Sequence, residues 1–115
     1  MDKRSILLIY TGGTIGMMKD YSSGALKAFD FSQLQKNIPE LNQLDCTISS
    51  FSFDYPIDSS NMNPGHWIAI SDIIADKYHE YDGFVVLHGS DTMSYTASAL
   101  SFLLENLSKP VILTG

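Results

Sequence analysis

The chain has 115 residues, close to the usual size of one domain, so it can bury a single hydrophobic core. Its 13 acidic and 7 basic residues give a formal charge of −6, which argues against nucleic-acid and membrane partners because it repels phosphates and anionic lipids. One cysteine rules out an intrachain disulfide, and no apolar run is long enough to span a bilayer, so we expect a cytoplasmic protein.

The first half of the chain predicts two strands separated by a long connection. Residues 6–10 form a continuous apolar run that ends at two glycines, as a buried parallel strand does. Residues 11–27 are polar and glycine-rich, which predicts a long flexible loop, and loops of that length are often functional. A short helix is predicted at 31–38. Residues 46–55 alternate between apolar and polar side chains, as in a second strand.

The next helix has a clear start signal. Asn63 can accept hydrogen bonds from the free amides of a first helical turn, and Pro64 suits the first helical position. The apolar residues that follow recur at helical spacing and predict one buried face: Trp67, Ile70, Ile73, Ile74 and Tyr78.

Two strands and one helix complete the chain. Residues 84–87 predict a buried strand, and 110–113 predict the last one. Between them a helix is expected from a cap at Asp91 or Thr92 to about Asn106. We expect four of its residues on the inner side: Tyr95, Ala99, Phe102 and Leu103.

Strands that alternate with helices predict an α/β fold. We expect an open, mostly parallel sheet of the Rossmann-like kind, with helices on both faces. The sequence stops at Gly115, where a loop leading to another helix is expected. We therefore expect one incomplete α/β domain over residues 1–115, without a carboxyl-terminal domain.

Three polar clusters stand at or near the carboxyl ends of predicted strands, where open α/β sheets bind ligands: residues 11–14, 58–61 and 88–92. Each also has an ordinary structural interpretation, as a glycine turn, a polar turn and a helix cap. The glycines of the first cluster match neither the dinucleotide-binding nor the P-loop spacing. We interpret His88 as a packed, hydrogen-bonded residue without a functional role.

Taken together, the clusters predict a site for a small amino acid. A hydroxyl flanked by glycines can act as a nucleophile where a base and an oxyanion site support it. The carboxylate of Asp91 is a natural partner for a substrate ammonium. Amides and hydroxyls around Ser59 could receive a substrate carboxylate.

Four segments resemble the bacterial-type asparaginase family, most closely its cytoplasmic, type I branch. The two signature segments are residues 10–17 (YTGGTIGM) and 87–102 (LHGSDTMSYTASALSF). Residues 58–62 (DSSNM) and 105–115 (ENLSKPVILTG) continue the match in the same order. The resemblance covers nearly the whole chain and implies an amidohydrolase of the asparaginase fold.

The resemblance implies hydrolysis of L-asparagine to aspartate and ammonia. Thr14 would be the nucleophile that forms an acyl-enzyme ester. Ser90 would supply the second hydroxyl, with Asp91 beside it binding the substrate amine. The segment Asp58, Ser59 and Ser60 would bind substrate, with Ser59 nearest the α-carboxylate. No cofactor and no metal is implied, and relatives suggest a homodimer or homotetramer.

The chain departs from the family pattern at several positions. The family usually has threonine where this chain has Ser90, and Tyr21 is the nearby candidate for a loop tyrosine that supports the nucleophile. The family's catalytic lysine would lie beyond Gly115, and Lys109 does not match it, so we expect these residues to be inactive alone. Two other functions stay open: an asparaginase-like subunit of a tRNA-dependent amidotransferase, and a non-catalytic amino-acid-binding α/β module.

Overall fold

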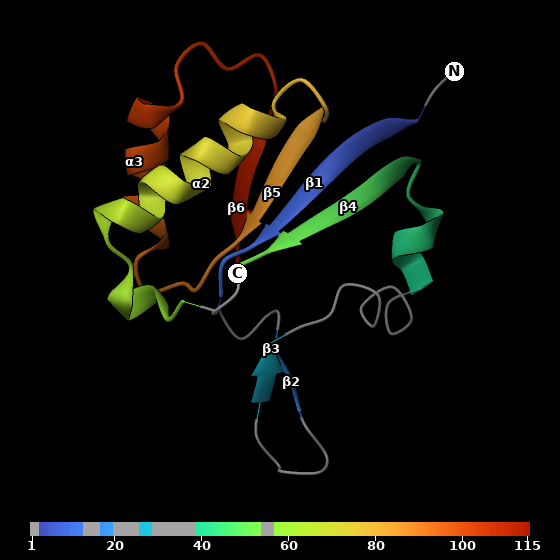
Figure 1. The fold of residues 1–115 in the computed structure, drawn as a ribbon. Helices are drawn as coiled ribbons and strands as arrows, with labels where there is room; N and C mark the ends of the chain where they lie inside the picture. Colours follow the sequence, from blue (N-terminus) through green and yellow to red (C-terminus); the bar gives the residue numbers. More distant parts are fainter. Residues whose placement is uncertain (1–2, 13–16, 20–25, 29–38, 54–56) are drawn as a thin grey trace.

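The computed structural model describes residues 3–12, 17–19, 26–28, 39–53 and 57–115. Four parallel strands form the main sheet in the order β4-β1-β5-β6 (Figure 1). In that order the strands are β4 (Cys46–Ser52), β1 (Arg4–Tyr10), β5 (Gly83–Leu87) and β6 (Val111–Thr114). The α/β fold predicted from the alternation of strands and helices is confirmed.

Two α-helices cover one face of this sheet. The helix α2 (Pro64–Lys77) joins β4 to β5, and α3 (Met93–Leu103) joins β5 to β6. Both connections cross the sheet in the same direction, so the right-handed crossover rule places both helices on the same face, as Figure 1 shows. The connection from β1 to β4 runs in the opposite direction across the strand order, and much of it lies outside the described residues.

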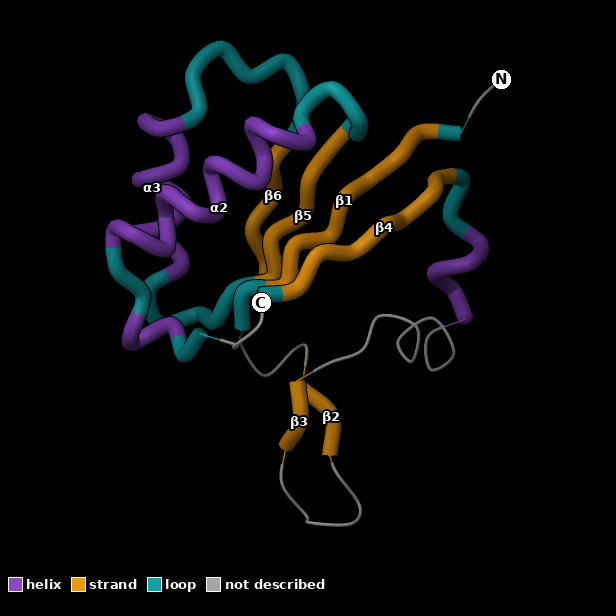
Figure 2. Tube along the Cα trace, viewed as in Figure 1, coloured by secondary structure: helices purple, strands orange, loops and turns teal. Residues whose placement is uncertain are grey.

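Short elements interrupt the connection where the sequence predicted only a long loop. The strands β2 (Met17–Lys19) and β3 (Leu26–Ala28) pair antiparallel and form a separate small sheet (Figure 2). Pairing satisfies the amides and carbonyls that the two strands turn toward each other, a gain that residue type alone did not reveal. The 3-10 helix η2 (Pro39–Gln43) follows, whereas the helix expected at 31–38 lies outside the described residues.

The hydrophobic core lies between the sheet and the two helices. The strand register pairs Leu7 with Phe84 and Ile9 with Val86. Since alternate residues of a strand share a face, these four side chains point to one side. They meet Ile70 and Ile74 of α2 and Leu100 of α3 in one buried cluster.

The start of α2 is the one that the sequence predicts. The side chain of Asn63 accepts from the amide of His66 at 3.2 Å, and His66 Nδ1 accepts from the amide of Asn63 at 3.1 Å. This reciprocal pair is a capping box in which histidine takes the place of the usual glutamate or glutamine. Behind it Ile70 and Ile74 are buried, which confirms the predicted apolar face.

The inner side of α3 differs from the prediction. Tyr95, Phe102 and Leu103 are 65%, 82% and 46% exposed, whereas Thr96 and Leu100 are buried. Tyr95 stands about 100° around the helix from Thr96, so it lies away from the centre of the buried face that Thr96 and Leu100 form. A polar residue takes the inner position because its hydroxyl finds partners there, which hydrophobic periodicity does not register.

The helix α3 also ends earlier than expected. Its last residue is Leu103, and the amide of Leu104 makes the final bond, to the carbonyl of Leu100 at 2.9 Å. Asn106, the predicted end, has a φ of 55°, a left-handed conformation that no helix residue adopts.

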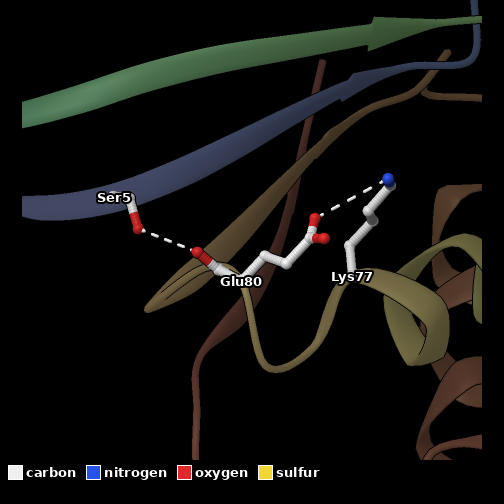
Figure 3. Close-up of polar contacts among 3 residues, drawn as sticks. All are labelled: Ser5, Lys77 and Glu80. Carbon is white, nitrogen blue, oxygen red and sulfur yellow. Dashed lines mark hydrogen bonds and ion pairs between the residues drawn. The ribbon is translucent and has the colours of Figure 1, made fainter.

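Polar contacts at the amino ends of the strands tie the turn after α2 to β1. The hydroxyl of Ser5 donates to the carbonyl of Glu80 at 3.3 Å, and the carboxylate of Glu80 lies 3.6 Å from Lys77 Nζ (Figure 3). The amide of Ser5 donates to the carboxylate of Asp82 at 2.7 Å.

Among the described residues, no helix combines the length and apolar character that crossing a membrane requires.

Candidate active site

The segment after β1 is held against its neighbours at the carboxyl edge of the sheet. Thr11 is fully buried, and both its amide and its hydroxyl donate to the carbonyl of Leu87, at 3.0 and 2.8 Å. Its own carbonyl accepts from the amide of Ile57 at 2.8 Å. A side chain on the next residue, Gly12, would collide with the carbonyl oxygen of Ile57. Glycine is therefore required where this segment passes the backbone of Ile57, just before the second polar cluster.

The predicted nucleophile lies just beyond this anchored segment. Residues 13–16, which include Thr14, lie outside the described residues, and so does Tyr21. Their roles stay predictions. The structure does establish the base from which the first cluster departs, with Thr11 and Gly12 packed against β5 and Ile57.

The second cluster forms a short 3-10 turn, η3 (Ser59–Asn61). The carboxylate of Asp58 accepts from the amide of Ser60 at 3.1 Å and so caps the turn. Asp58 and Ser60 are exposed, whereas Ser59 is buried. One of the three predicted substrate-binding residues thus faces inward, and the two others face solvent.

The third cluster docks on the second through Ser59. The hydroxyl oxygen of Ser59 accepts from the amide of Asp91 at 3.2 Å, and its carbonyl accepts from the hydroxyl of Thr92 at 2.7 Å. A Cβ on Gly89 would lie 2.7 Å from the Ser59 hydroxyl oxygen, so glycine permits this close approach. The structure therefore joins clusters that are more than thirty residues apart in the sequence.

The side chains of Ser90 and Asp91 stand outward from this docked loop. Both residues are exposed, and within the described part of the chain neither side chain has a hydrogen-bond or ion-pair partner. Thr92 occupies the cap position of α3, but its hydroxyl bonds to Ser59 rather than to the amides of the helix. Thr92 therefore stands at the predicted cap position, but its hydroxyl joins the two loops instead of capping the helix amides.

Burial at this edge also affects a tyrosine and a histidine. Tyr10, at the end of β1, is 2% exposed, and its burial raises the pKa of the phenol because the ionised form loses solvation. His88 is fully buried and hydrogen-bonded through both ring nitrogens, as the sequence interpretation expected. Thr96, the partner of His88, was missed because a polar residue inside an apolar helical pattern gives no signal of its own.

The arrangement offers exposed polar side chains on a rigid base. A carboxylate and a hydroxyl face solvent from Asp91 and Ser90, in the loop that follows β5, and the carbonyl of Leu87 at the end of β5 holds Thr11. No group of three or more metal-ligating side chains occurs among the residues that the structure describes. Such a site can bind a small polar molecule carrying an ammonium group through charge-assisted hydrogen bonds.

Comparison with known sequences identifies relatives of the whole chain. Residues 5–115 match the family described as Asparaginase, N-terminal. The chain is 49% identical over 120 residues to L-asparaginase 1 of Escherichia coli strain K12, a match that covers 100% of this chain and 34% of that protein. It is 44% identical over 112 residues to a subunit of the Glutamyl-tRNA(Gln) amidotransferase of Pyrococcus abyssi, covering 96% of this chain and 25% of that protein.

Solved structures carry the same arrangement of elements. L-asparaginase I from Vibrio cholerae superposes with a TM-score of 0.87 and 49% identity, covering 99% of this chain and 33% of the other. The probable cytoplasmic L-asparaginase from Campylobacter jejuni gives a TM-score of 0.73 and 35% identity, covering 96% of this chain and 32% of the other. The chain thus spans about a third of the length of these asparaginases.

Proposed function

This chain belongs to the asparaginase family, matching its amino-terminal domain, and on that basis we propose that the full-length gene product hydrolyses L-asparagine to aspartate and ammonia. We propose further that residues 1–115 are one α/β domain of that enzyme, that it works in the cytoplasm, and that it assembles as a homodimer or homotetramer. The docking of the loop carrying Ser90 and Asp91 onto Ser59 is the observation that carries the proposal.

In the proposed reaction the hydroxyl oxygen of Thr14 attacks the side-chain amide carbon of asparagine. A carbon–oxygen bond forms, the carbon–nitrogen bond breaks, and the nitrogen leaves as ammonia after taking up a proton. Water then hydrolyses the ester, which releases aspartate and restores the Thr14 hydroxyl. Splitting one difficult step into two easier ones is the usual gain of covalent catalysis.

The proposed recognition of the substrate follows from charge and exposure. The exposed carboxylate of Asp91 binds the α-ammonium group, while Ser90 presents its hydroxyl to the substrate beside it. Ser59 already accepts from the Asp91 amide, so its hydroxyl proton is what it can offer to the α-carboxylate. Ser60 adds an exposed hydroxyl. Asp58 acts mainly through the turn, because its carboxylate caps η3.

A test of the proposal measures ammonia release from L-asparagine by the full-length gene product and by its Thr14→Ala variant. We expect release by the first and loss of nearly all of it in the second, at least a hundredfold, with unchanged thermal unfolding. Equal rates in the two proteins would remove Thr14 from the mechanism. An inactive parent protein that still binds asparagine would instead support a non-catalytic binding module.

The second candidate is an asparaginase-like amidotransferase subunit, which the identity to the amidotransferase subunit of Pyrococcus abyssi favours. Such a subunit would pass ammonia to a partner that holds tRNA. Ammonia release that requires neither a partner protein nor tRNA supports the hydrolase, whereas release that depends on both supports the amidotransferase.

A further inference from the structure

A chain of buried hydrogen bonds runs behind the loop that carries Ser90 and Asp91. His88 directly follows β5 and is fully buried. Its ring nitrogens have different partners: Nδ1 lies 2.5 Å from the carbonyl oxygen of Gly89, and Nε2 lies 2.8 Å from Oγ1 of Thr96. The indole nitrogen of Trp67 donates to the same Oγ1 at 2.9 Å. The helices α2 and α3 are thereby connected to the end of β5.

The partners indicate the direction of the bonds in this chain. A carbonyl oxygen can only accept, so the proton on the His88 ring is on Nδ1 and is donated to Gly89. The indole of Trp67 can only donate, so Thr96 accepts from it and has its own hydroxyl proton available for Nε2 of His88. The tautomer that fits these partners carries its proton on Nδ1, and no buried side-chain polar atom among the described residues lacks a partner.

The hydrogen bond from His88 sets the orientation of the peptide group between Gly89 and Ser90. The described chain contains no cis peptide bond, so the N–H of Ser90 points away from the Gly89 carbonyl that His88 holds. That N–H has no hydrogen-bond partner within the described residues. The bond from the buried ring thus fixes the direction of a backbone donor in the loop that carries Ser90 and Asp91.

The Ser90–Asp91 pair is held from both ends. Before Ser90, the Gly89 carbonyl accepts from the imidazole of His88; after it, the amide of Asp91 donates to the hydroxyl oxygen of Ser59. A backbone segment anchored on both sides by buried partners has little freedom to rotate, so its two exposed side chains leave the backbone in fixed directions.

We propose that His88 is a positioning residue for the proposed amide hydrolysis. Its Nδ1–H sets the orientation of the peptide between Gly89 and Ser90, and so determines where Ser90 and Asp91 meet the substrate. His88 itself does not touch the substrate and exchanges no proton with it. The catalytic consequence rests on the proposed function, whereas the tautomer and the orientation of the peptide do not.

Two substitutions of His88 by amide side chains, made in the full-length gene product, distinguish the roles of the two ring nitrogens. In His88→Asn the side-chain amide nitrogen is attached to Cγ, as Nδ1 is, so it can still donate to the Gly89 carbonyl. In His88→Gln the amide lies one atom further out, where it reaches Thr96 but leaves that carbonyl without its donor. Both variants bury a neutral amide, and thermal unfolding shows whether both fold.

The expected result is a loss in kcat of about 100-fold for His88→Gln, the size that a small misplacement of reacting groups produces, with a smaller change in KM. We expect His88→Asn to recover at least about tenfold of that loss, since it retains the orienting bond. Equal kcat values in the two variants, whether high or low, would overturn the proposal, because the donor at Nδ1 would then not matter.

Nitrogen NMR of the parent protein tests the positioning without relying on activity. We expect the proton of His88 on Nδ1 at neutral pH, and a larger shift of the Ser90 amide signal in His88→Gln than in His88→Asn. A proton on Nε2 would overturn the proposal. If the parent protein releases no ammonia, the proposed function fails, but these spectra still decide whether His88 orients the peptide.

A third variant tests the proposal if neither His88→Asn nor His88→Gln folds. Thr96→Val keeps the branched shape of the side chain but removes the hydroxyl that donates to Nε2. We expect the proton to stay on Nδ1, because the Gly89 carbonyl still needs a donor, with a loss in kcat of about tenfold because the ring is less firmly held. An unchanged kcat would contradict the role given to the bond between Thr96 and His88.

Discussion

Polar residues at the two ends of the strands are used in different ways. At the carboxyl ends Thr11, Ser59, His88 and Thr96 are 0 to 4% exposed, and every one is hydrogen-bonded. At the amino ends the contacts around Ser5 lie at the surface and tie a turn to the sheet. A buried polar group that loses its partner carries a large cost, whereas an exposed one can turn to water.

Two tyrosines express the same difference. Burial raises the pKa of Tyr10 at the carboxyl end of β1. At the other end the phenol oxygen of Tyr78 accepts from the amides of Ser108 and Lys109, at 2.7 and 3.1 Å. Hydrogen bonds from the side chain and the amide of Ser108 are the main reason that the pKa of Tyr78 is lowered. The comparison teaches that buried hydrogen bonds fix the positions of polar groups at the carboxyl ends of the strands. At the amino ends, surface contacts only hold neighbouring elements together.

The largest expected effect comes from adding one carbon at the carboxyl end. In Gly12→Ala the new Cβ meets the backbone of Ile57, which cannot move aside as a flexible side chain can. We expect a loss of about 3 kcal/mol in the free energy of unfolding of the full-length gene product, measured in urea. Gly65→Ala is the matched control, since its Cβ meets only the side chain of Asn63, at 3.1 Å. Similar losses in the two variants would break the comparison.

A smaller loss is expected from Ser59→Ala, which removes the acceptor for the Asp91 amide and the close partner of Gly89. The amide is left without its bond, at a cost of about 1–3 kcal/mol, and Asp91 is no longer held. Ser60→Ala is the control for stability, because Ser60 is exposed. If urea unfolding finds no difference between the two variants, the bond between the loops contributes nothing to stability.

The tyrosines predict opposite responses to alkaline pH. The pKa of Tyr78 is lowered, so its contribution to stability is complete above pH 10 and is lost as the pH falls through the pKa of the folded protein. Tyr10 has a raised pKa, so its contribution is present below pH 10 and is lost as the pH rises through its folded value.

Thermal unfolding of Tyr78→Phe and Tyr10→Phe across this range checks both signs. Relative to the parent protein, we expect the deficit of Tyr78→Phe to grow as the pH approaches 10 from below. We expect Tyr10→Phe to lose less stability than the parent protein above pH 10. Parallel pH curves for all three proteins would show that neither shift bears on folding.

The smallest expected effect is at the amino end. Lys77 and Glu80 form an ion pair at 3.6 Å with side chains that are 39% and 61% exposed (Figure 3). Solvent screens such a pair, so Lys77→Gln should change the free energy of unfolding by no more than about 0.5 kcal/mol. A loss above about 2 kcal/mol would mean that the amino end is as sensitive as the carboxyl end.

The sequence by itself determined the family and the succession along the chain of the strands and helices that build the main sheet. Asn63 and Pro64 start α2 because a cap and its amides lie within one turn of each other, and the apolar run of β1 is equally local. The signature segments were recognisable because the family pattern is carried by residue type and spacing. The roles proposed for Thr14 and Tyr21 rest on the sequence alone, since both residues lie outside the described residues.

The tertiary structure decided which polar residues are buried. Thr96 lies on the inner side of α3 in place of Tyr95 because its hydroxyl meets Trp67, 29 residues away, and His88. Ser59 holds the loop of Asp91 from 32 residues away. The free energy of burying a hydroxyl depends on whether a partner is within reach, and a partner that is distant in sequence becomes near only when the sheet and helices have packed.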